Sequence, residues 1–388
     1  MSGAGAALPL ALYVHMPWCV RKCPYCDFNS HQLKSATPPG GYIDGLIHDF
    51  DTELPFLGDR RIESVFFGGG TPSLFPPEEF ARLLEVFKQR IPFAPDAEVT
   101  MEANPGTLER GRFAGYRAAG INRVSLGAQS FSPEALGRLG RIHGPDDTYR
   151  AVEELHAAGL ENFNLDLMYA LPQQTLAEAV ADVNIACELA PAHISHYQLA
   201  LEPGTVFHAQ PPPLPDEDAA YLMQDECQRI LAANGFTQYE VSAYSHTGAR
   251  CRHNLNYWLF GDYVGVGAGA HGKLTSQAPD RILRTVKPRQ PRDYLDRLSD
   301  SPMLTVIGER NNVPAAELPF EFMLNALRLN EGFAVADFES RTGLPMSAAE
   351  PALERAQRRG LIEDMGTGWR PTELGRRFLN DLQASFLA

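Results

Sequence analysis

The sequence predicts an α/β protein: a partial, open (βα)6 barrel, then an α+β extension, then a small C-terminal domain resembling a winged helix. Three observations support this prediction. Short β-branched or aromatic runs alternate with amphipathic stretches between Leu12 and Glu202, as parallel βα units do. A stiff, proline-rich segment around Pro211–Pro213 interrupts this alternation. From Pro319 the chain becomes helical, and it finishes with a pattern typical of a two-stranded wing.

Six strands and five helices are expected in the barrel. The strands are predicted over 12–16, 64–70, 98–104, 123–130, 163–170 and 193–202. The helices are predicted over 42–56, 77–90, 107–119, 145–158 and 176–189, with Thr107 and Pro145 as helix starts.

The rest of the chain is predicted more coarsely. We expect a helix over 216–234, a strand near 237–244, and a polar stretch rich in Arg and Pro over 279–315. Helices at about 319–330, 334–341 and 347–359 follow, then the wing and a last helix. The expected units are a flexible tail (1–10), the barrel (11–205), the extension (206–310) and the C-terminal domain (311–388).

Bulk properties exclude several classes of protein. The net charge is −14 and the pI about 5.3, so the surface does not attract nucleic acid or anionic lipid. The C-terminal domain is also negatively charged, because it has eight Lys and Arg but eleven Asp and Glu, a net charge of −3. This charge argues against a DNA-binding winged helix. No signal peptide and no transmembrane run are found. We therefore expect a cytoplasmic protein whose six cysteines do not form a disulfide framework.

Polar residues and glycines gather where the predicted strands end. The carboxyl ends of parallel barrel strands form the active-site face, so these positions predict one shared site. They are Gly68, Gly69, Gly70, Thr71, Glu102, Asn104, Gln129, Ser130, Asp166, Tyr197 and Gln198.

The first strand leads into Cys19, Cys23 and Cys26, spaced C-x3-C-x2-C. Three thiolates can hold three irons of a [4Fe–4S] cube and leave the fourth iron open. Zinc remains an alternative with His15 and His31 as further ligands, although structural zinc sites usually show two separated pairs of ligands. Three unrelated structural cysteines are a weaker alternative, because Pro17 and Pro24 mark the segment as an exposed loop.

This spacing, with Tyr25 before the last cysteine and the later run Gly68-Gly69-Gly70-Thr71-Pro72, resembles the radical S-adenosylmethionine (SAM) superfamily. The resemblance implies that SAM chelates the open iron and is cleaved to a 5′-deoxyadenosyl radical. The cofactor supplies that chemistry and the protein orients it. The glycine run implies a close backbone approach to SAM.

The segments LYVHMPWCVRKCPYCDF, FFGGGTPS, MEANPGT, RVSLGAQSF, GRIH and FNLDLMYALP resemble one family closely. It comprises the oxygen-independent coproporphyrinogen III oxidases and their HemW-type heme-chaperone relatives. The resemblance implies that Tyr13, Gly69 and Glu102 contact a first SAM. It places Tyr25, Gly70, Thr71, Gln129, Arg141 and Asp166 at the contacts of a second SAM.

Two departures set the chain apart from the oxidases. Phe28 stands where they carry a further cysteine, and only about ten residues precede the first strand. The HemW-type branch shares both features and adds an H-N-x-x-Y-W motif, here His253 to Trp258. The resemblance implies heme contacts for His253, Tyr257 and Trp258. From the residues alone, packing of these side chains in the core is the favoured interpretation.

Other residues near this motif were also considered for heme. Arg250 and Arg252 are candidates for the propionates, and Cys251 does not complete a C-x-x-C-H attachment site. Residues 265–272 do not match a dinucleotide fingerprint. They predict a close backbone approach near the barrel mouth, with His271 as a further heme or SAM neighbour.

The sequence thus predicts a radical SAM heme chaperone that binds a [4Fe–4S] cluster, SAM and heme. Its partners would be a heme-acceptor protein, with respiratory proteins among the candidates, and an electron donor such as flavodoxin or ferredoxin. The alternatives are a coproporphyrinogen III oxidase, which Phe28 disfavours, and a SAM-cleaving enzyme for an unrelated substrate. No catalytic residue is assigned.

Overall fold

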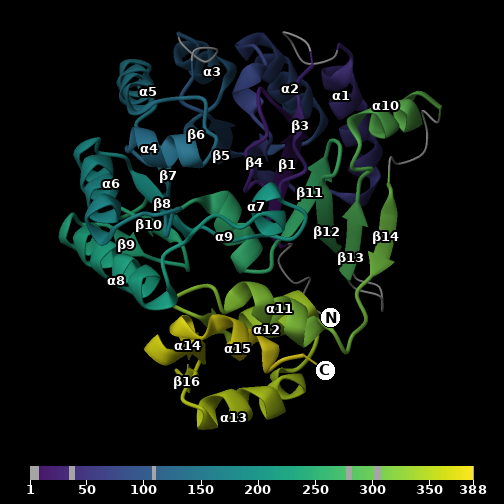
Figure 1. Ribbon diagram of the computed structural model, residues 1–388. Helices are drawn as coiled ribbons and strands as arrows, with labels where there is room; N and C mark the ends of the chain where they lie inside the picture. Colours follow the sequence, from purple (N-terminus) through teal and green to yellow (C-terminus); the bar gives the residue numbers. More distant parts are fainter. Residues whose placement is uncertain (1–7, 35–39, 107–110, 277–281, 301–306, 388) are drawn as a thin grey trace.

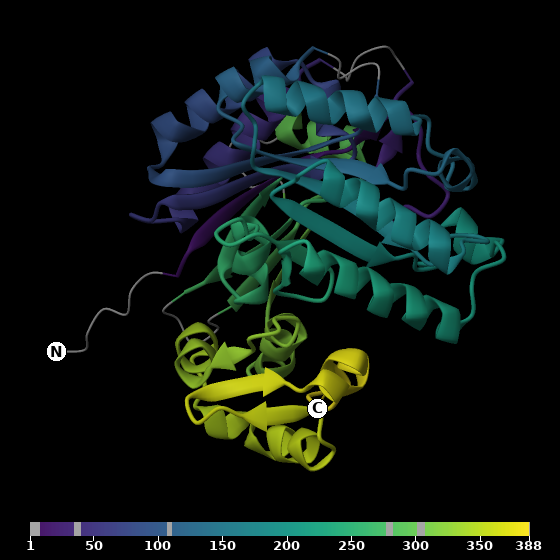
Figure 2. The same ribbon diagram turned by 90° about the vertical axis from the view of Figure 1, so that its left-hand side faces the viewer.

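The computed structural model describes residues 8–34, 40–106, 111–276, 282–300 and 307–387. A single twelve-stranded sheet forms its centre, with strand order β14-β13-β12-β11-β1-β4-β5-β6-β7-β8-β10-β9. Figures 1 and 2 show helices covering the outer side of this curved sheet, while the C-terminal domain lies apart below it.

The six predicted barrel strands are confirmed, and each pairs with the next in parallel. They are β1 (Leu10–Met16), β4 (Ile62–Gly69), β5 (Phe93–Ala103), β6 (Arg123–Gln129), β7 (Phe163–Tyr169) and β8 (His193–Gln198). Most of their residues are buried on both faces, as expected for parallel strands between helices and a barrel interior. The sixth strand ends at Gln198, earlier than the predicted residue 202.

The barrel helices also follow the prediction, with two differences. They are α1 (Tyr42–Glu53), α2 (Pro77–Arg90), α3 (Phe113–Ala119), α4 (Pro133–Arg138), α5 (Pro145–Ala157) and α6 (Leu176–Glu188). The short helix α4, capped by Ser132, was not predicted. The expected helix start at Thr107 lies outside the described residues, and α3 begins at Phe113. Short 3₁₀ turns occupy Leu54–Phe56, Pro72–Leu74 and Met346–Ala348.

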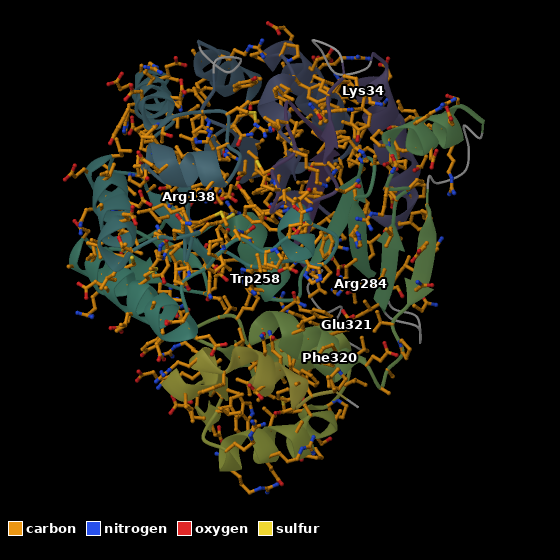
Figure 3. The ribbon with its side chains drawn as sticks, viewed as in Figure 1. Lys34, Arg138, Trp258, Arg284, Phe320 and Glu321 are labelled. Carbon is orange, nitrogen blue, oxygen red and sulfur yellow. The ribbon has the colours of Figure 1, made fainter. Side chains whose placement is uncertain are left out.

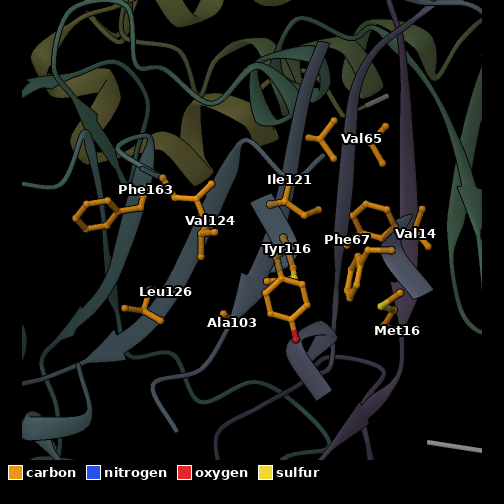
Figure 4. Packing of buried hydrophobic residues seen from close by; sticks show 14 of the residues in the cluster. Val14, Met16, Val65, Phe67, Ala103, Tyr116, Ile121, Val124, Leu126 and Phe163 are labelled. Atoms are coloured by element: carbon orange, nitrogen blue, oxygen red, sulfur yellow. The ribbon is translucent and has the colours of Figure 1, made fainter. Parts of the chain in front are cut away.

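The core lies between the sheet and its helices. Figure 4 shows Val14 and Met16 of β1 beside Phe67 of β4, and Val124 and Leu126 of β6 farther along the same sheet. All five side chains are buried. This packing fixes the strand ends that carry the predicted site.

The extension is more regular than predicted. Its elements are α7 (Val206–Ala209), α8 (Glu217–Ala233), β9 (Thr237–Gln238), β10 (Ala243–Ser245), α9 (Arg252–Trp258), β11 (Asp262–Val266), β12 (His271–Thr275), β13 (Ile282–Val286), α10 (Pro291–Asp300) and β14 (Glu309–Asn312). Within the polar stretch of 279–315, the described part forms β13, α10 and β14, for which no element was predicted. The antiparallel pairing of β13 with β12 and β14 supplies the backbone hydrogen bonds that order it.

A seventh parallel strand, β11, pairs with β1 on the side away from β4. It belongs to the glycine-rich stretch in which only a close backbone approach was expected. That approach is present, because a Cβ on Gly265 would lie 2.0 Å from the His271 carbonyl oxygen and one on Gly267 2.5 Å from that of His15. The glycines let β11 and the following turn pack tightly against β1.

The C-terminal domain shows the expected helices and wing. Its elements are α11 (Leu318–Ala326), β15 (Phe333–Ala334), α12 (Val335–Thr342), α13 (Glu350–Arg358), β16 (Ile362–Asp364), β17 (Gly368–Pro371), α14 (Glu373–Arg377) and α15 (Leu379–Ala384). Strand β17 pairs with both β15 and β16, and the predicted last helix is divided into α14 and α15. The domain has its own hydrophobic core, to which Phe260 and Ile282 of the extension contribute.

Among the described residues, no helix is long and apolar enough to cross a membrane.

Candidate functional site

The carboxyl ends of the barrel strands surround a cavity of about 600 Å³. Of the residues predicted to bind the cluster, to contact SAM or, within the H-N-x-x-Y-W motif, to contact heme, all but Trp258 line it, whereas the strand-end positions Gly68, Ser130 and Gln198 do not. These lining residues are Tyr13, Cys19, Cys23, Tyr25, Cys26, Gly69, Gly70, Thr71, Glu102, Gln129, Arg141, Asp166, His253 and Tyr257. The structure thus brings together residues as far apart in the sequence as Tyr13 and Tyr257.

Cys19 ends the short strand β2 (Trp18–Cys19), and Cys23 and Cys26 lie in the loop between β2 and β3 (His31–Gln32). All three thiols are free and partly exposed to the cavity. Burial raises the pKa of Cys19 and of Cys26, so their thiolates need a cation such as iron. Across the described residues, no group of three His, Cys, Asp or Glu side chains is already drawn together as a metal site.

The donor set nevertheless fits an iron–sulfur cluster. Three thiols on one loop match three irons of a cube, and Arg141 places its Nη1 3.8 Å from the sulfur of Cys23. A guanidinium at this position offsets the negative charge of thiolate ligands. Arg141 is itself held by the carbonyl oxygen of Gly127, 2.8 Å from Nη2.

The zinc alternative loses its extra ligands. The two ring nitrogens of His15 are hydrogen-bonded, one to the Tyr13 hydroxyl at 3.0 Å and the other to the Asn29 carbonyl at 2.9 Å. His15 therefore has no free ring nitrogen, and His31, whose Nε2 lacks a hydrogen-bond partner among the described residues, lies outside the cavity lining.

The glycine turn after β4 is packed against the start of the cysteine loop. Gly69 has φ of +109°, and a Cβ there would lie 2.2 Å from the His15 ring. The N–H of Gly70 donates to the Met16 carbonyl at 2.9 Å, and that of Thr71 to the Trp18 carbonyl at 2.7 Å. Only glycine permits this backbone position, and it exposes the turn to a ligand in the cavity.

Two carboxyl groups face the interior of the cavity. Loss of hydration raises the pKa of Glu102 to about 8, with the nearby charge of Asp166 adding to the effect. Burial also raises the pKa of Asp166. Hydrogen bonds donated by Ser125 at 3.0 Å and Asn164 at 2.9 Å act in the opposite direction and lower this pKa, but burial has the larger effect. Two such acids favour a ligand that brings positive charge or hydroxyl donors.

Gln129 lies in a strained turn at the end of β6, with φ of +69°. Asp182 of α6 holds the next two residues, because it accepts hydrogen bonds from the Ser130 hydroxyl and the Phe131 N–H, both at 2.7 Å. Asp182 is buried, and desolvation raises its pKa to about 6. No local sequence pattern indicates this residue, since it lies on a helix 52 positions away from Ser130.

One further lining residue, Asn164, was not predicted although the sequence pattern indicates it. Asn164 lines the cavity two positions before Asp166, on the same face of β7. Side chains at i and i+2 of a strand share a face, so Asp166 already pointed to Asn164. Asn104, which was noted at a strand end, donates to the Thr71 hydroxyl at 2.8 Å.

The H-N-x-x-Y-W motif lies on helix α9, and three of its residues, His253, Asn254 and Tyr257, line the cavity. His253 is 1% exposed, with Nδ1 3.1 Å from the Ser64 hydroxyl and Nε2 3.0 Å from that of Tyr257. Its ring stacks on Phe66 at 5.0 Å. Burial lowers the pKa of His253 to about 3, so the imidazole is neutral and both nitrogens are already engaged.

Trp258 lies on another side of α9, toward the C-terminal domain (Figure 3). The guanidinium of Arg328 lies 4.2 Å from its ring centre. The structure therefore does not bring Trp258 to His253 and Tyr257, because consecutive residues of a helix point about 100° apart.

The other candidates for heme contacts also lie outside the cavity lining. Arg250 pairs with Glu331 at 2.6 Å, and Arg252 pairs with Asp96 at 3.0 Å. His271 is exposed at the start of β12 and likewise does not line the cavity. None of the three faces the cluster loop.

Comparisons with known proteins agree with this geometry. Residues 13–185 match the Radical SAM superfamily, and residues 313–378 match the HemN C-terminal domain. The chain is 48% identical to "Heme chaperone HemW" of Escherichia coli K12 over 98% of both chains, and 47% identical to that of Haemophilus influenzae over 98% of both. It is also 35% identical to the mitochondrial radical S-adenosyl methionine domain-containing protein 1 of Bos taurus, over 97% of this chain and 87% of that one.

Among solved structures, coproporphyrinogen III oxidase (HemN) of E. coli superposes with a TM-score of 0.82, covering 98% of this chain and 90% of that one. Their sequences are 21% identical, so this likeness concerns the fold. The sequence motifs, the cavity and the full-length similarity lead to one conclusion: the chain belongs to the HemW family of the radical SAM superfamily.

Proposed function

We propose that the protein is a heme chaperone of the radical SAM type. It binds a [4Fe–4S] cluster, SAM and heme, and it passes heme to an acceptor protein in the cytoplasm. One observation carries the proposal: the motif thiols, the glycine turn and the paired acids line one cavity in a chain that is similar to HemW of E. coli from end to end.

Cys19, Cys23 and Cys26 are the proposed ligands of the cluster, and the fourth iron faces the cavity. When bound, the cluster supplies one electron to SAM. The chain contributes the three thiolates, the neighbouring Arg141 cation and the loop geometry. Ser30 supports the loop, with its hydroxyl 3.7 Å from the sulfur of Cys26.

SAM is the proposed ligand of the polar interior. Its amino and sulfonium groups carry positive charge, and its ribose carries hydroxyl donors. Glu102 and Asp166 offer carboxylates for both, and a cationic ligand offsets the cost of ionising them there. Tyr13, Gly69 and Glu102 are the proposed contacts of a first SAM. The proposed contacts of a second are Tyr25, Gly70, Thr71, Gln129, Arg141 and Asp166.

The heme function is proposed from sequence similarity, because the similar proteins from E. coli and H. influenzae are named heme chaperones. Of the motif residues, His253 and Tyr257 reach the cavity and Trp258 does not. The proposed partners are a heme-acceptor protein and an electron donor of the flavodoxin or ferredoxin type.

The test is a heme titration followed by transfer. Full-length protein, reconstituted anaerobically with iron and sulfide, is titrated with hemin and then mixed with an apo-heme protein such as apomyoglobin. We expect a saturable Soret band at one heme per chain, and movement of that heme to the acceptor faster than from a serum albumin control. Binding no tighter than albumin overturns the proposal. Formation of protoporphyrinogen IX from coproporphyrinogen III, SAM and a reductant would instead identify an oxidase.

A further inference from the structure

Large apolar side chains face solvent around the opening of the cavity. Val20 is 38% exposed, Phe28 58%, Ile142 62% and Tyr197 40%, and all four line the cavity. We call these four residues the apolar rim. Clustered exposed apolar side chains of this size usually mark a binding surface.

The apolar rim is assembled from three separate parts of the chain. Val20 and Phe28 belong to the cysteine loop, Ile142 to the connection between α4 and α5, and Tyr197 to the end of β8. Such distant segments meet only because the sheet brings their strand ends together. The arrangement therefore belongs to the folded site and does not come from one apolar stretch of sequence.

The rim differs in chemistry from the interior that it surrounds. The interior presents Glu102, Asp166 and Arg141, which suit a small polar ligand. A second ligand that covers the opening would meet apolar surface at its edge. A large, flat and apolar molecule buries such a ring of side chains better than a compact polar one does.

Charged residues at the opening favour one orientation of a bound ligand. Arg21 lines the cavity, and its side chain is exposed. Asp27 and Glu202 also line the cavity. A ligand with carboxylates on one edge is therefore favoured with that edge toward Arg21 and away from the two acids.

His253 is poorly placed to bind such a ligand. Both ring nitrogens of His253 have hydrogen-bond partners, and its side chain is stacked against Phe66. An iron bond to His253 would first break one of these contacts in a buried position.

We infer that the apolar rim is the docking surface for the macrocycle of an iron porphyrin, whose propionate edge lies toward Arg21. This inference rests on the proposed heme-chaperone function and names the surface that it uses. The porphyrin covers the opening above the cysteine loop, and its iron does not require His253 as a ligand.

The test compares rim variants with matched controls in the full-length, cluster-reconstituted protein. Phe28→Ser and Ile142→Ser remove apolar rim area. Phe378→Ser and Leu222→Ser remove similar side chains that are 49% and 53% exposed elsewhere. The dissociation constant for hemin is measured from the Soret band, and the iron and sulfide contents are measured for each variant.

We expect each rim variant to bind hemin roughly tenfold more weakly, because about one large apolar contact is lost. The double variant should bind more weakly still, Phe28→Leu should recover most of the affinity, and the controls should match wild type. Arg21→Gln should weaken binding of hemin but not of its dimethyl ester, which lacks the carboxylates.

Three outcomes contradict the inference. If wild type binds hemin and the rim variants match the controls, the rim is not the docking surface, while the proposed function stands. If His253→Ala alone abolishes the Soret band, the iron sits at α9 instead. If wild type binds hemin no better than albumin, the proposed function and the inference both fail. Ile142 lies outside the cysteine loop, so its variant remains decisive if Phe28→Ser loses the cluster.

Discussion

The N–H of Gly69 donates a hydrogen bond to the Glu102 carboxylate at 3.0 Å. This bond joins the glycine turn of β4 to the end of β5, the next strand in the sheet. A ligand that contacts the backbone of Gly69 therefore also meets the charge of Glu102. The relationship makes Glu102 the most informative acid to change.

Glu102→Gln should weaken SAM binding at least tenfold, because it removes a charge but keeps an acceptor for the Gly69 N–H. Isothermal titration of the cluster-loaded protein with SAM measures the effect. Glu153→Gln, at an exposed position of α5, serves as the control. Unchanged affinity in Glu102→Gln would remove this residue from the proposed SAM contacts.

The same substitution should change how stability depends on pH. The pKa of Glu102 is raised from 4.5 to about 8 in the folded protein. Between these values the folded state binds a proton that the unfolded state has released, so the free energy of unfolding falls as pH rises. Glu102→Gln should remove this fall, matching wild type near pH 4.5 and exceeding it by on the order of 4 kcal/mol near pH 8. Urea denaturation without SAM at both pH values checks the prediction.

Asp182→Ala should loosen the turn that carries Gln129. The Ser130 hydroxyl and the Phe131 N–H would lose their acceptor in a buried position, which costs about 2–4 kcal/mol of unfolding free energy. Asp182→Asn keeps one acceptor and should cost less. If Gln129 contacts SAM, the alanine variant should also bind SAM more weakly at a temperature where it remains folded. Equal SAM affinity in both variants and wild type would limit Asp182 to a structural role.

Arg328→Ala should destabilise the junction between the extension and the C-terminal domain. Arg328 lies over the Trp258 ring and donates to Glu240 at 3.0 Å, and Glu240 is only 4% exposed. Its loss leaves a buried carboxylate unpaired, at a cost of about 3 kcal/mol. Arg358→Ala removes an exposed pair with Glu354 and should cost under about 0.5 kcal/mol. Thermal unfolding and limited proteolysis at the junction compare the two variants.

Cys23→Ala should abolish cluster assembly, since two thiolates cannot replace three on the cube. Iron and sulfide analysis after anaerobic reconstitution, with the visible absorbance of the cluster, measures the loss. Cys187→Ala, on α6 and away from the cavity, should assemble the cluster like wild type. Zinc bound in place of iron in the wild-type protein would contradict the cluster assignment.

Much of the fold was predictable because its signals are local. The barrel strands are short apolar runs that end in polar residues or glycine, and helices such as α5 and α6 begin with clear first-turn residues. Helix α9 lacked such signals. Glu98 of β5 accepts hydrogen bonds from the N–H groups of Arg252 and His253, both at 3.1 Å. A partner 154 residues away thus caps this short helix.

The site was predictable where its chemistry depends on the spacing of residues along the sequence. The three cysteines and most of the predicted strand-end residues meet at the cavity, but Gly68, Ser130 and Gln198 do not line it. Adjacency in sequence misled the prediction for the H-N-x-x-Y-W motif, because His253 and Tyr257 share a helix face at i and i+4 while Trp258 does not. Asp182 needed the tertiary structure, since its role depends on a contact between α6 and the end of β6.

The position of β1 between β4 and β11 has a consequence for biosynthesis. One edge of β1 pairs with β11, through the residues Leu10 to Val14 and Asp262 to Val266. The strand that leads into the cysteine loop therefore has only one neighbouring strand until most of the polypeptide has left the ribosome. Such long-range pairing delays folding. A truncated chain ending near residue 205 would leave β1 as an open edge that invites aggregation. The metallocentre is thus expected to be built after translation, on a nearly finished chain.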